Sequence, residues 1–347
     1  MKSSRRALLS AVALSAALSG LSAVPAHAAE VTLRFHQMLP SMAPIPRLAV
    51  RSWIKAVEEA SGGRIEIKQY DSMSLGGKPP ELFDQAKDGV VDIIWTVLSY
   101  TPGRFPKTEV FELPFMTTNA TTGSMAIQDF VSRNAMDEFK DVKLITVHTH
   151  GPGAFHTKDP IEKMEDLKGK KIRGAGRVVN DLLTKLGATP IGMPVPAVAE
   201  ALSKGVIDGT TIPFEVVPPL KVQQLVKNHT KFAKGIALYT NTFGVVMNKA
   251  KYDALPADLK KVIDDHSGQY AAKLFGSVMD KGDEGGLALV KKAGNRVIEI
   301  DEIEMQRWKR YASQVETDWV ERTKANGIDA DALVKDARAT IAKFESQ

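Results

Sequence analysis

One short pattern occurs twice in the sequence and constrains the fold more than any other feature. It reads Gly89-Val90-Val91-Asp92 in the first half and Gly205-Val206-Ile207-Asp208 in the second. Each copy follows a helical segment and precedes a strand-like one, which is typical of α/β architecture. We interpret the pair as one structural joint used once in each of two similar α/β lobes. Coincidence remains the alternative, because joints of this kind are common.

The rest of the chain alternates between strand-like and helix-like segments. Val31–Phe35 and Arg64–Lys68 alternate apolar and polar residues, whereas Ile45–Ala60 and residues 122–139 have helical apolar spacing. This alternation predicts an α/β fold with two lobes. The chain is expected to cross between lobes at the Gly- and Pro-rich stretch 148–153 and to return along the strand-like stretch 236–247. The expected division is lobe 1, residues 29–150 plus about 236–278, and lobe 2, residues 151–235 plus about 279–347.

The N-terminus has the three parts of a secretory signal. Lys2, Arg5 and Arg6 precede an apolar run over residues 7–24, and Ala26-His27-Ala28 forms an A-x-A cleavage site. We expect cleavage near Ala28 and export to the periplasm. No later stretch approaches the ~18–20 apolar residues of a membrane-spanning helix.

Net charge and cysteine content exclude some classes of function. The formal net charge is +5, but three basic residues lie in the leader, so the mature chain is near neutral and gives no support for nucleic-acid binding. The chain has no cysteine, which excludes disulfides, thiol chemistry and thiolate metal sites.

The stretch from Met164 to Gly176 carries the strongest candidate for ligand binding. It reads as an acidic helical turn, a tight turn at Gly169 and a short strand over Lys170–Arg173. Open α/β sheets bind ligands at the carboxyl ends of their strands, and a guanidinium there matches a carboxylate with two parallel hydrogen bonds. We therefore predict that Arg173 anchors an anionic ligand. The alternative is an exposed arginine at the strand end, paired with a nearby acid.

Further candidates follow other predicted strands. Four aromatic residues are predicted to lie at or just past the carboxyl end of a strand: Trp95, Tyr100, Phe155 and Phe214. Three tryptophans have helical spacing instead and are expected to be packing residues: Trp53, Trp308 and Trp319. A flat apolar pocket with one fixed cation suits an acid with an apolar or ring-bearing body. The predicted walls of this pocket are Trp95, Tyr100, Phe155, Val195 and Phe214. The predicted hydrogen-bonding residues are His36, Gln37, Thr96 and His150.

No residue set predicts catalysis or a cofactor. The chain lacks a G-x-S-x-G elbow, a P-loop, an H-E-x-x-H pair and a complete G-x-G-x-x-G motif. His148 and His150 share a strand face, with His156 nearby, but no acidic or third ligand completes a metal site. We expect neutral histidines at the crossing between lobes instead.

Taken in order, several motifs resemble those of a known family, the DctP-like receptors of TRAP-type transporters. The motifs are Ser61–Ile65, Leu75–Gly77, Gly89–Asp92, Val110–Phe115, Asp166–Arg173, Gly187–Pro190 and Gly205–Gly209. The resemblance covers essentially the whole mature chain. It implies a two-lobed periplasmic binding protein (type II-like), with hinge strands and a long helix that spans both lobes. It also implies closure on an organic acid and delivery to a sodium-driven membrane permease.

In that family the arginine of the K-x-R strand clamps the substrate carboxylate, and here the matching residue is Arg173. The chain departs from the pattern at Gly153, where many sugar-acid receptors carry a second arginine, and at Ile212–Phe214, where an asparagine is frequent. The position of Tyr100 is charged in some members. Each departure removes polarity. We therefore predict a receptor for a monocarboxylate, aromatic or otherwise apolar-bodied.

Three alternatives remain from the sequence. A C4-dicarboxylate receptor would use Lys78 or Lys158 as its second cation. A periplasmic enzyme would need a nucleophile and base that the chain does not supply. A ligand-sensing partner of a membrane kinase would use the same cleft, and the sequence does not distinguish it from a transport receptor. We expect a monomer that is not an enzyme and uses neither cofactor nor metal.

Overall fold

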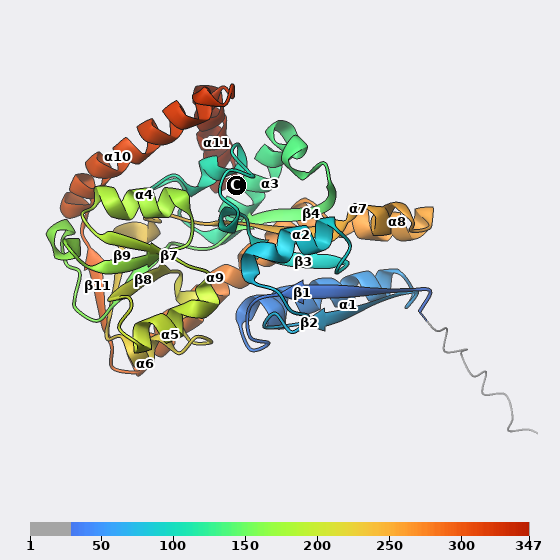
Figure 1. Ribbon diagram of the computed structural model, residues 1–347, viewed down its shortest axis with the longest axis horizontal. Helices are drawn as coiled ribbons and strands as arrows, with labels where there is room; N and C mark the ends of the chain where they lie inside the picture. Colours follow the sequence, from blue (N-terminus) through green and yellow to red (C-terminus); the bar gives the residue numbers. More distant parts are fainter. Residues whose placement is uncertain (1–28, 347) are drawn as a thin grey trace, which may run out of the picture.

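The computed structural model describes residues 29–346, so the predicted leader lies outside the described residues. The strands form two mixed sheets, one in each half of the molecule (Figure 1). The first sheet has the order β2-β1-β3-β10-β4 and the second β11-β9-β5-β8-β6-β7. The strands are β1 Val31–Gln37, β2 Ile65–Tyr70, β3 Ile93–Val97, β4 Val142–Thr149, β5 Ala154–Thr157, β6 Lys171–Gly174, β7 Thr189–Gly192, β8 Gly209–Ile212, β9 Asn228–Phe232, β10 Thr242–Asn248 and β11 Arg296–Ile300.

Helices cover both sheets and connect them, which gives the predicted α/β fold with two lobes. They are α1 Arg51–Ala60, α2 Leu82–Lys87, α3 Ala120–Asn134, α4 Arg177–Lys185, α5 Val198–Ser203, α6 Val222–Leu225, α7 Lys249–Asp253, α8 Ala257–Asp265, α9 Gln269–Lys292, α10 Glu302–Ala325 and α11 Ala330–Glu345. No helix in the described range is long and apolar enough to span a membrane.

Two predicted helices differ from the structure at their ends. Residues Ile45–Val50 form a wider π-type turn before α1, at the place where Pro46 has no backbone N–H to donate. The helix predicted over 122–139 is α3, which begins at Ala120 because the side chain of Asn119 accepts the N–H of Thr122. It ends at Asn134, and a separate 3₁₀ turn follows over Met136–Phe139.

Both copies of the repeated pattern form the same joint. Gly89 and Gly205 take left-handed conformations, with φ of +76° and +70°, that let α2 and α5 end directly before β3 and β8. Asp92 Oδ2 accepts the backbone N–H of Arg34 at 2.7 Å, and Asp208 Oδ2 accepts that of Lys171 at 2.8 Å. Each aspartate thus fixes its own strand to the neighbouring parallel strand, β1 or β6.

The long helix α9 contacts both lobes, as expected. It packs on α3 and β4 of the first lobe, and on β11 and the 3₁₀ turn Phe214–Val216 of the second. Asp280 accepts the N–H groups of Ala120 and Thr121 at the start of α3, at 2.7 and 2.9 Å. Asp283, one turn later, accepts the N–H of Glu215 at 2.8 Å. Two aspartates on one helix therefore hold one lobe each.

Helix α10 also bridges the lobes. In α10, Trp308 packs on Phe155 of the second lobe, and Trp319 Nε1 donates to Glu109 of the first at 3.0 Å. Trp53, Trp308 and Trp319 are fully buried, which confirms their predicted packing role.

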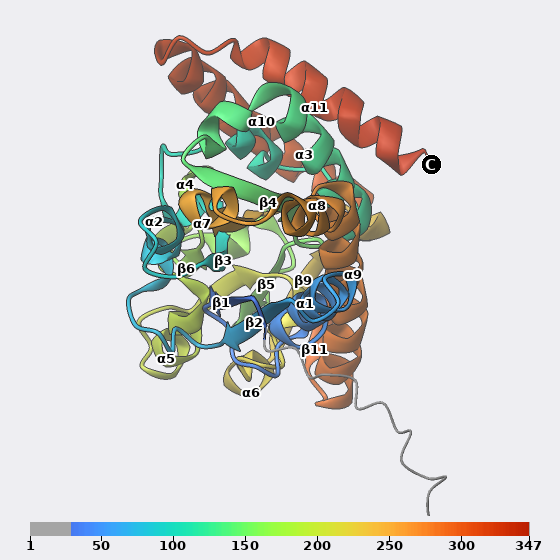
Figure 2. The same ribbon diagram turned by 90° about the vertical axis from the view of Figure 1, so that its right-hand side faces the viewer.

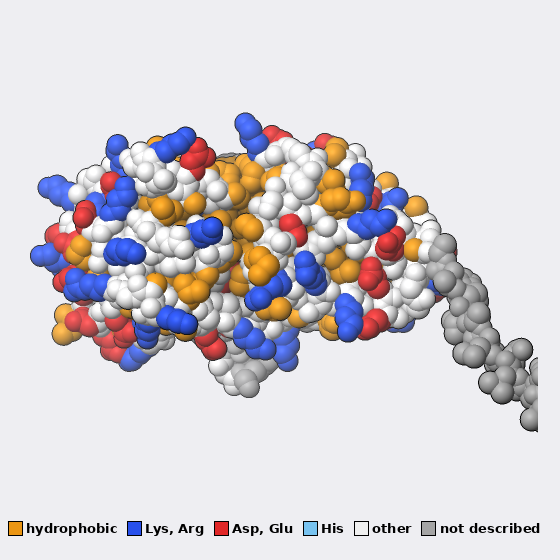
Figure 3. Space-filling view, turned by 90° about the horizontal axis from the view of Figure 1, so that it is seen from below, with side chains coloured by type: hydrophobic (Ala, Val, Ile, Leu, Met, Phe, Trp, Pro, Cys, Tyr) orange, Lys and Arg blue, Asp and Glu red, His pale blue; other side chains and the backbone are white. Residues whose placement is uncertain are grey.

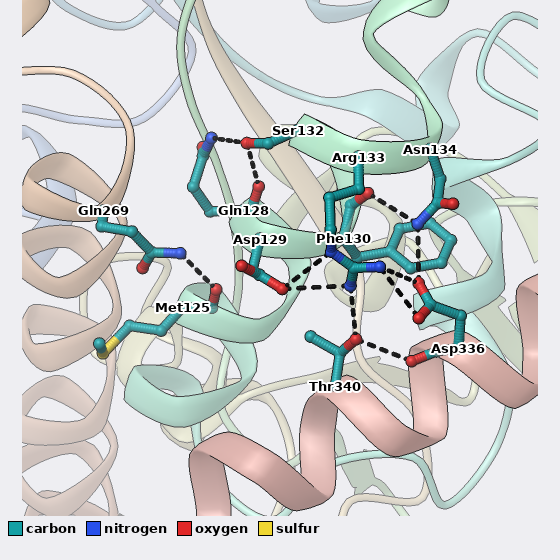
Figure 4. A network of polar contacts seen from close by, with 10 residues as sticks. All are labelled: Met125, Gln128, Asp129, Phe130, Ser132, Arg133, Asn134, Gln269, Asp336 and Thr340. Atoms are coloured by element: carbon teal, nitrogen blue, oxygen red, sulfur yellow. Dashed lines mark hydrogen bonds and ion pairs between the residues drawn. The ribbon is translucent and has the colours of Figure 1, made fainter.

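Helix α11 lies on α3 of the first lobe, although the expected division groups residues 279–347 with the second (Figure 2). Figure 4 shows the polar contacts between the two helices: Arg133 pairs with Asp336 at 2.8 Å and donates to Thr340 at 2.8 Å. Asn134 Nδ2 donates to Asp336 as well, at 2.7 Å. The end of the chain is therefore anchored to the first lobe.

Candidate ligand-binding site

A cavity lies between the carboxyl ends of strands of the two sheets, the edge at which open α/β sheets bind their ligands. The first lobe lines it with Met38, Leu39, Trp95, Val97 and Tyr100. The second lobe lines it with Arg173, Ala175, Val195, Ile212, Pro213, Glu215 and Val216, and the crossing segments with His150, Tyr239, Asn241 and Phe243.

Arg173 lies near the end of β6, as predicted, and is 2% exposed. Its Nε donates to the carbonyl of Met193 at 2.8 Å and its Nη1 to the carbonyl of Thr211 at 3.1 Å. Nη2 donates to the hydroxyl of Tyr100 at 3.4 Å. A guanidinium has five N–H donors. Three bonds therefore fix its plane and leave donors for a further acceptor.

The charge of Arg173 is not neutralised by any side chain of the described residues. No aspartate or glutamate within residues 29–346 forms an ion pair with it, so the alternative of an arginine paired with a nearby acid is excluded for that range. A buried charge is stable only when it is paired. The site therefore suits an anion from outside the chain.

Tyr100 connects the arginine to the other lobe. Its oxygen accepts from Arg173 and from the backbone N–H of Val195, the latter at 2.8 Å. Burial raises the pKa of Tyr100 despite the nearby arginine. The hydroxyl therefore keeps its proton and has it free to donate to a carboxylate beside the guanidinium.

One wall of the cavity is a flat aromatic surface. The rings of Trp95 and Phe243 stack with centroids 5.1 Å apart and an interplanar angle of 4°. Trp95 Nε1 donates to His148 Nε2 at 2.7 Å, and the His148 ring lies within 8° of Phe243. Burial lowers the pKa of His148 to about 3, so it stays neutral and accepts this bond. The wall thus has a fixed orientation.

Tyr239 occupies the space opposite Gly153. A Cβ atom at Gly153 would lie 2.1 Å from Tyr239 Cε1, so no larger side chain fits there while the tyrosine keeps its position. Tyr239 is 1% exposed, and its hydroxyl has no hydrogen-bond partner in the described part of the chain. Where many sugar-acid receptors are expected to carry a second arginine, this cavity has an aromatic ring.

Five of the ten predicted site residues line this cavity: Arg173, Trp95, Tyr100, Val195 and His150. His150 does so without a free donor. Its Nδ1 contacts the carbonyl of Gly151 at 2.5 Å, and its Nε2 accepts the N–H of Asn241 at 3.0 Å. Burial, together with the charge of Arg173, lowers its pKa to about 4. His150 therefore presents a neutral ring rather than a hydrogen-bond donor.

The other two hydrogen-bonding candidates near the first strand are occupied within the first lobe. His36 Nδ1 contacts Gln85 at 2.8 Å, and its Nε2 accepts the N–H of Leu75 at 3.3 Å. Gln37 Nε2 donates to Leu39 and Asp71 at 2.6 and 2.7 Å. The structure places neither on the cavity, because both order the loops that follow β1 and β2.

Three further predicted residues point into the protein interior. Thr96 alternates with Trp95 along β3, and its hydroxyl contacts the carbonyl of Pro79 instead. Phe155 packs on Trp308, and Phe214 packs on the histidine pair His156 and His229. Phe155 and Phe214 were predicted to lie at or just past the carboxyl end of a strand, which is wrong for Phe155, the second residue of β5. The direction of a side chain from its strand decides which residues reach the cavity.

Several lining residues were missed from the sequence, among them Met38, Glu215, Tyr239 and Phe243. Tyr239 and Phe243 flank the start of β10, inside the stretch that was predicted to return to the first lobe. Because β10 pairs with β3, the residues at the start of β10 lie close to Trp95. A prediction that the returning strand pairs with β3 would therefore have indicated Tyr239 and Phe243. No group of three or more metal-ligating side chains occurs among the described residues.

Comparisons with known proteins identify the family. Residues 37–322 match the bacterial extracellular solute-binding proteins, family 7, also called DctP. The C4-dicarboxylate-binding periplasmic protein DctP of Rhodobacter capsulatus is 26% identical over 96% of this chain and 97% of its own.

Two solved structures are more similar still. A TRAP solute-binding protein from Rhodoferax ferrireducens T118, in complex with copurified benzoate, is 48% identical, with a TM-score of 0.89 over 91% of this chain and 98% of its own. A marine metagenome TRAP solute-binding protein specific for aromatic acid ligands, in complex with 3-hydroxybenzoate, is 44% identical, with a TM-score of 0.89 over 91% and 99%. The predicted resemblance is confirmed, and the chain belongs to the DctP family of TRAP-transporter solute-binding proteins, which are binding proteins and not enzymes.

Proposed function

We propose that this receptor captures an aromatic or otherwise apolar-bodied monocarboxylate and delivers it to the membrane permease of a TRAP transporter. Arg173 forms a two-pronged salt bridge with the carboxylate, and the Tyr100 hydroxyl donates a third hydrogen bond. Trp95, Phe243 and Tyr239 enclose the body of the acid. The observation that carries the proposal is a buried arginine that has free donors and no acidic partner among residues 29–346 and that lines the same cavity as a flat aromatic wall.

The relatives support the aromatic ligand class. The two proteins at 48% and 44% identity were solved with benzoate and with 3-hydroxybenzoate. A planar acid suits a flat aromatic wall because offset aromatic contacts add attraction beyond the area that they bury.

The cavity is less suited to the C4-dicarboxylate alternative. Arg173 is the only lysine or arginine among its lining residues within 29–346, and neither Lys78 nor Lys158 is one of them. A second carboxylate would lie without a counter-ion, close to Glu215, and an unpaired buried charge is strongly unfavourable.

Delivery requires the receptor to open and close. The chain crosses between lobes at residues 148–153 and near Tyr239–Asn241, while α9 holds one lobe with Asp280 and the other with Asp283. We propose that lobe 1 comprises residues 29–150 and about 236–278 with α11 docked on it, and lobe 2 most of the remainder. Closure about these crossings traps the ligand, and the permease recognises the closed form. On this proposal the protein acts in the periplasm, as a monomer, after cleavage near Ala28.

A ligand panel tests the proposal directly. The receptor, freed of copurified ligand by unfolding and refolding, is titrated with benzoate, phenylacetate, succinate and malate while thermal unfolding is followed. A ligand at about 100 times its Kd adds ~2.7 kcal/mol to the free energy of unfolding, so the expected result is stabilisation by the two aromatic acids alone. Stabilisation by succinate or malate without benzoate would establish the dicarboxylate alternative instead.

A further inference from the structure

Glu215 is the carboxylic acid among the residues that line the cavity. It is 4% exposed, and its Oε2 has no hydrogen-bond partner among residues 29–346. A buried carboxyl group without a partner is destabilising unless a ligand completes its hydrogen bonds. The protein therefore retains an unfavourable group at the place where a ligand would meet it.

The backbone around Glu215 is held firmly. The residue lies in the 3₁₀ turn Phe214–Val216 that follows β8, and its N–H donates to Asp283 of α9 at 2.8 Å. A Cβ atom at Gly282 would lie 2.7 Å from the Cβ of Glu215, so the absence of a side chain on α9 permits this close approach. The carboxyl group is thus fixed at the cavity by contacts that do not use its own oxygens.

Arg173 and Glu215 are held by different contacts: the guanidinium donates to Met193, Thr211 and Tyr100, and Glu215 is fixed through its N–H to α9. The charge of Arg173 acts on Tyr100, Tyr239 and His150. Glu215 forms no ion pair with it; burial, with the neighbouring Asp283, raises the pKa of Glu215 to about 8. At neutral pH the carboxyl group is mostly protonated, and it then both donates and accepts hydrogen bonds.

We propose that Glu215 is a specificity-determining residue that selects acids whose apolar body carries a hydroxyl group, with the hydroxyl bound to Glu215 while the carboxylate is bound to Arg173. This inference rests on the proposed function, because it takes Arg173 as the carboxylate anchor. A hydroxyl matches a neutral carboxyl group, since each gives one hydrogen bond and accepts another. An unsubstituted ring leaves the carboxyl group unpaired, and sites built to bond a hydroxyl discriminate against ligands that lack one.

Calorimetric titration with benzoate and with 2-, 3- and 4-hydroxybenzoate tests this inference. At least one isomer is expected to bind the wild-type receptor about tenfold more tightly than benzoate, the gain of one satisfied buried bond. Glu215→Met should abolish that preference, because a thioether cannot exchange hydrogen bonds with a hydroxyl as a carboxyl group does. Glu215→Gln should keep most of the preference, because a carboxamide also donates and accepts. If Glu215→Met does not fold, Glu215→Ala takes its place.

Glu112→Gln is the matched control. Glu112 is also fully buried, and its Oε2 likewise has no partner among the described residues, but its Oε1 accepts two bonds from Thr242 and the residue does not line this cavity. Its substitution should leave the ratio of hydroxybenzoate to benzoate affinity unchanged. If benzoate binds and no isomer is preferred, or if the preference survives in Glu215→Met, the role of Glu215 is overturned and the proposed function stands. If none of the four acids binds, both are overturned.

Discussion

His36 in the first lobe and Arg173 in the second occupy equivalent positions. Each follows, at the same spacing, the strand residue whose N–H is accepted by the joint aspartate, Asp92 or Asp208. Their uses differ. Gln85 and Leu75 occupy both ring nitrogens of His36, whereas Arg173 keeps donors free at the cavity. The same framework thus orders a loop in one lobe and leaves a cation for a ligand in the other.

The wall positions show the same asymmetry. Val97 and Pro213 occupy matching places after the joint, as do Tyr100 and Val216, and all four line the cavity. The first lobe has the larger side chain at the second of these places and adds Trp95. The first lobe therefore provides the wall, and the second provides the anchor and Glu215.

On the face shown in Figure 3, apolar side chains gather near the middle while acidic and basic ones are interspersed, so no single sign of charge dominates that face.

The largest expected effect comes from changing the anchor itself. Arg173→Lys keeps the charge but loses the planar pair of donors, along with contacts to Met193, Thr211 or Tyr100. Loss of charge-assisted bonds worth about 1.5–3 kcal/mol each predicts benzoate binding weakened at least ~100-fold by calorimetry.

The equivalent change in the first lobe is the control. His36→Ala should lower the free energy of unfolding by about 1–3 kcal/mol, because it leaves Gln85 and the Leu75 N–H without their partner, yet benzoate affinity should change little. Near-wild-type affinity in Arg173→Lys would remove Arg173 from its proposed role, and a large loss of affinity in His36→Ala would end the distinction between the two positions.

A smaller effect is expected at the crossing between the lobes. Gly153→Ala places a methyl group against the ring of Tyr239, and such overpacking costs about 1–3 kcal/mol of stability. In a Tyr239→Val background the same change should cost much less, which a double-mutant cycle of urea unfolding would measure. Additive costs in that cycle would mean that the ring and the glycine are not coupled.

The repeated joint also explains what the sequence could predict. It correctly indicated two lobes, because a glycine stop and an aspartate before a strand act through local geometry. Aligning the two copies of the joint would also have improved the prediction of the site. Phe214 then matches Leu98, and neither residue lines the cavity, whereas Val216 matches Tyr100, and both do. The residue Tyr239 could not be placed from the sequence, because its position depends on how a distant segment packs against Gly153.

The joint itself allows a finer comparison of the lobes. Asp92→Asn and Asp208→Asn each weaken a charge-assisted bond to a neighbouring strand, at a cost of about 1–2 kcal/mol. Asp92→Asn should cost more, since Asp92 Oδ2 also accepts from the Arg34 side chain at 3.2 Å and is 7% exposed. Urea unfolding of both variants measures the difference. An equal loss would show that the side-chain contact of Arg34 adds nothing.

The last expected effect is a pH dependence of stability that arises mainly where the second lobe meets α9. Burial, with Asp283 nearby, raises the pKa of Glu215 to about 8, and burial, with Asp280 nearby, raises the pKa of Asp283 to about 8. The unfolded chain releases these protons near its ordinary values of 4.5 and 3.8, so the stability they contribute is complete below those values and is lost as the pH rises toward 8. Buried histidines such as His148, with lowered pKa values, change stability only below about 6.5.

Between pH 6.5 and 8 the carboxyl groups therefore determine the slope. Glu112 of the first lobe contributes less over this range, because burial raises its pKa only to about 7. The free energy of unfolding should fall by about 1–2 kcal/mol across the window for each carboxyl group whose pKa is about 8. Glu215→Gln should flatten the fall of the free energy of unfolding with pH, because it removes one titrating group and the negative charge of Glu215 no longer acts on Asp283. Glu112→Gln should change this slope less. Equal slopes in the two variants would mean that Glu215 and Asp283 titrate no differently from a buried carboxyl group elsewhere in the protein. The functional asymmetry of the lobes would then depend on Arg173 alone.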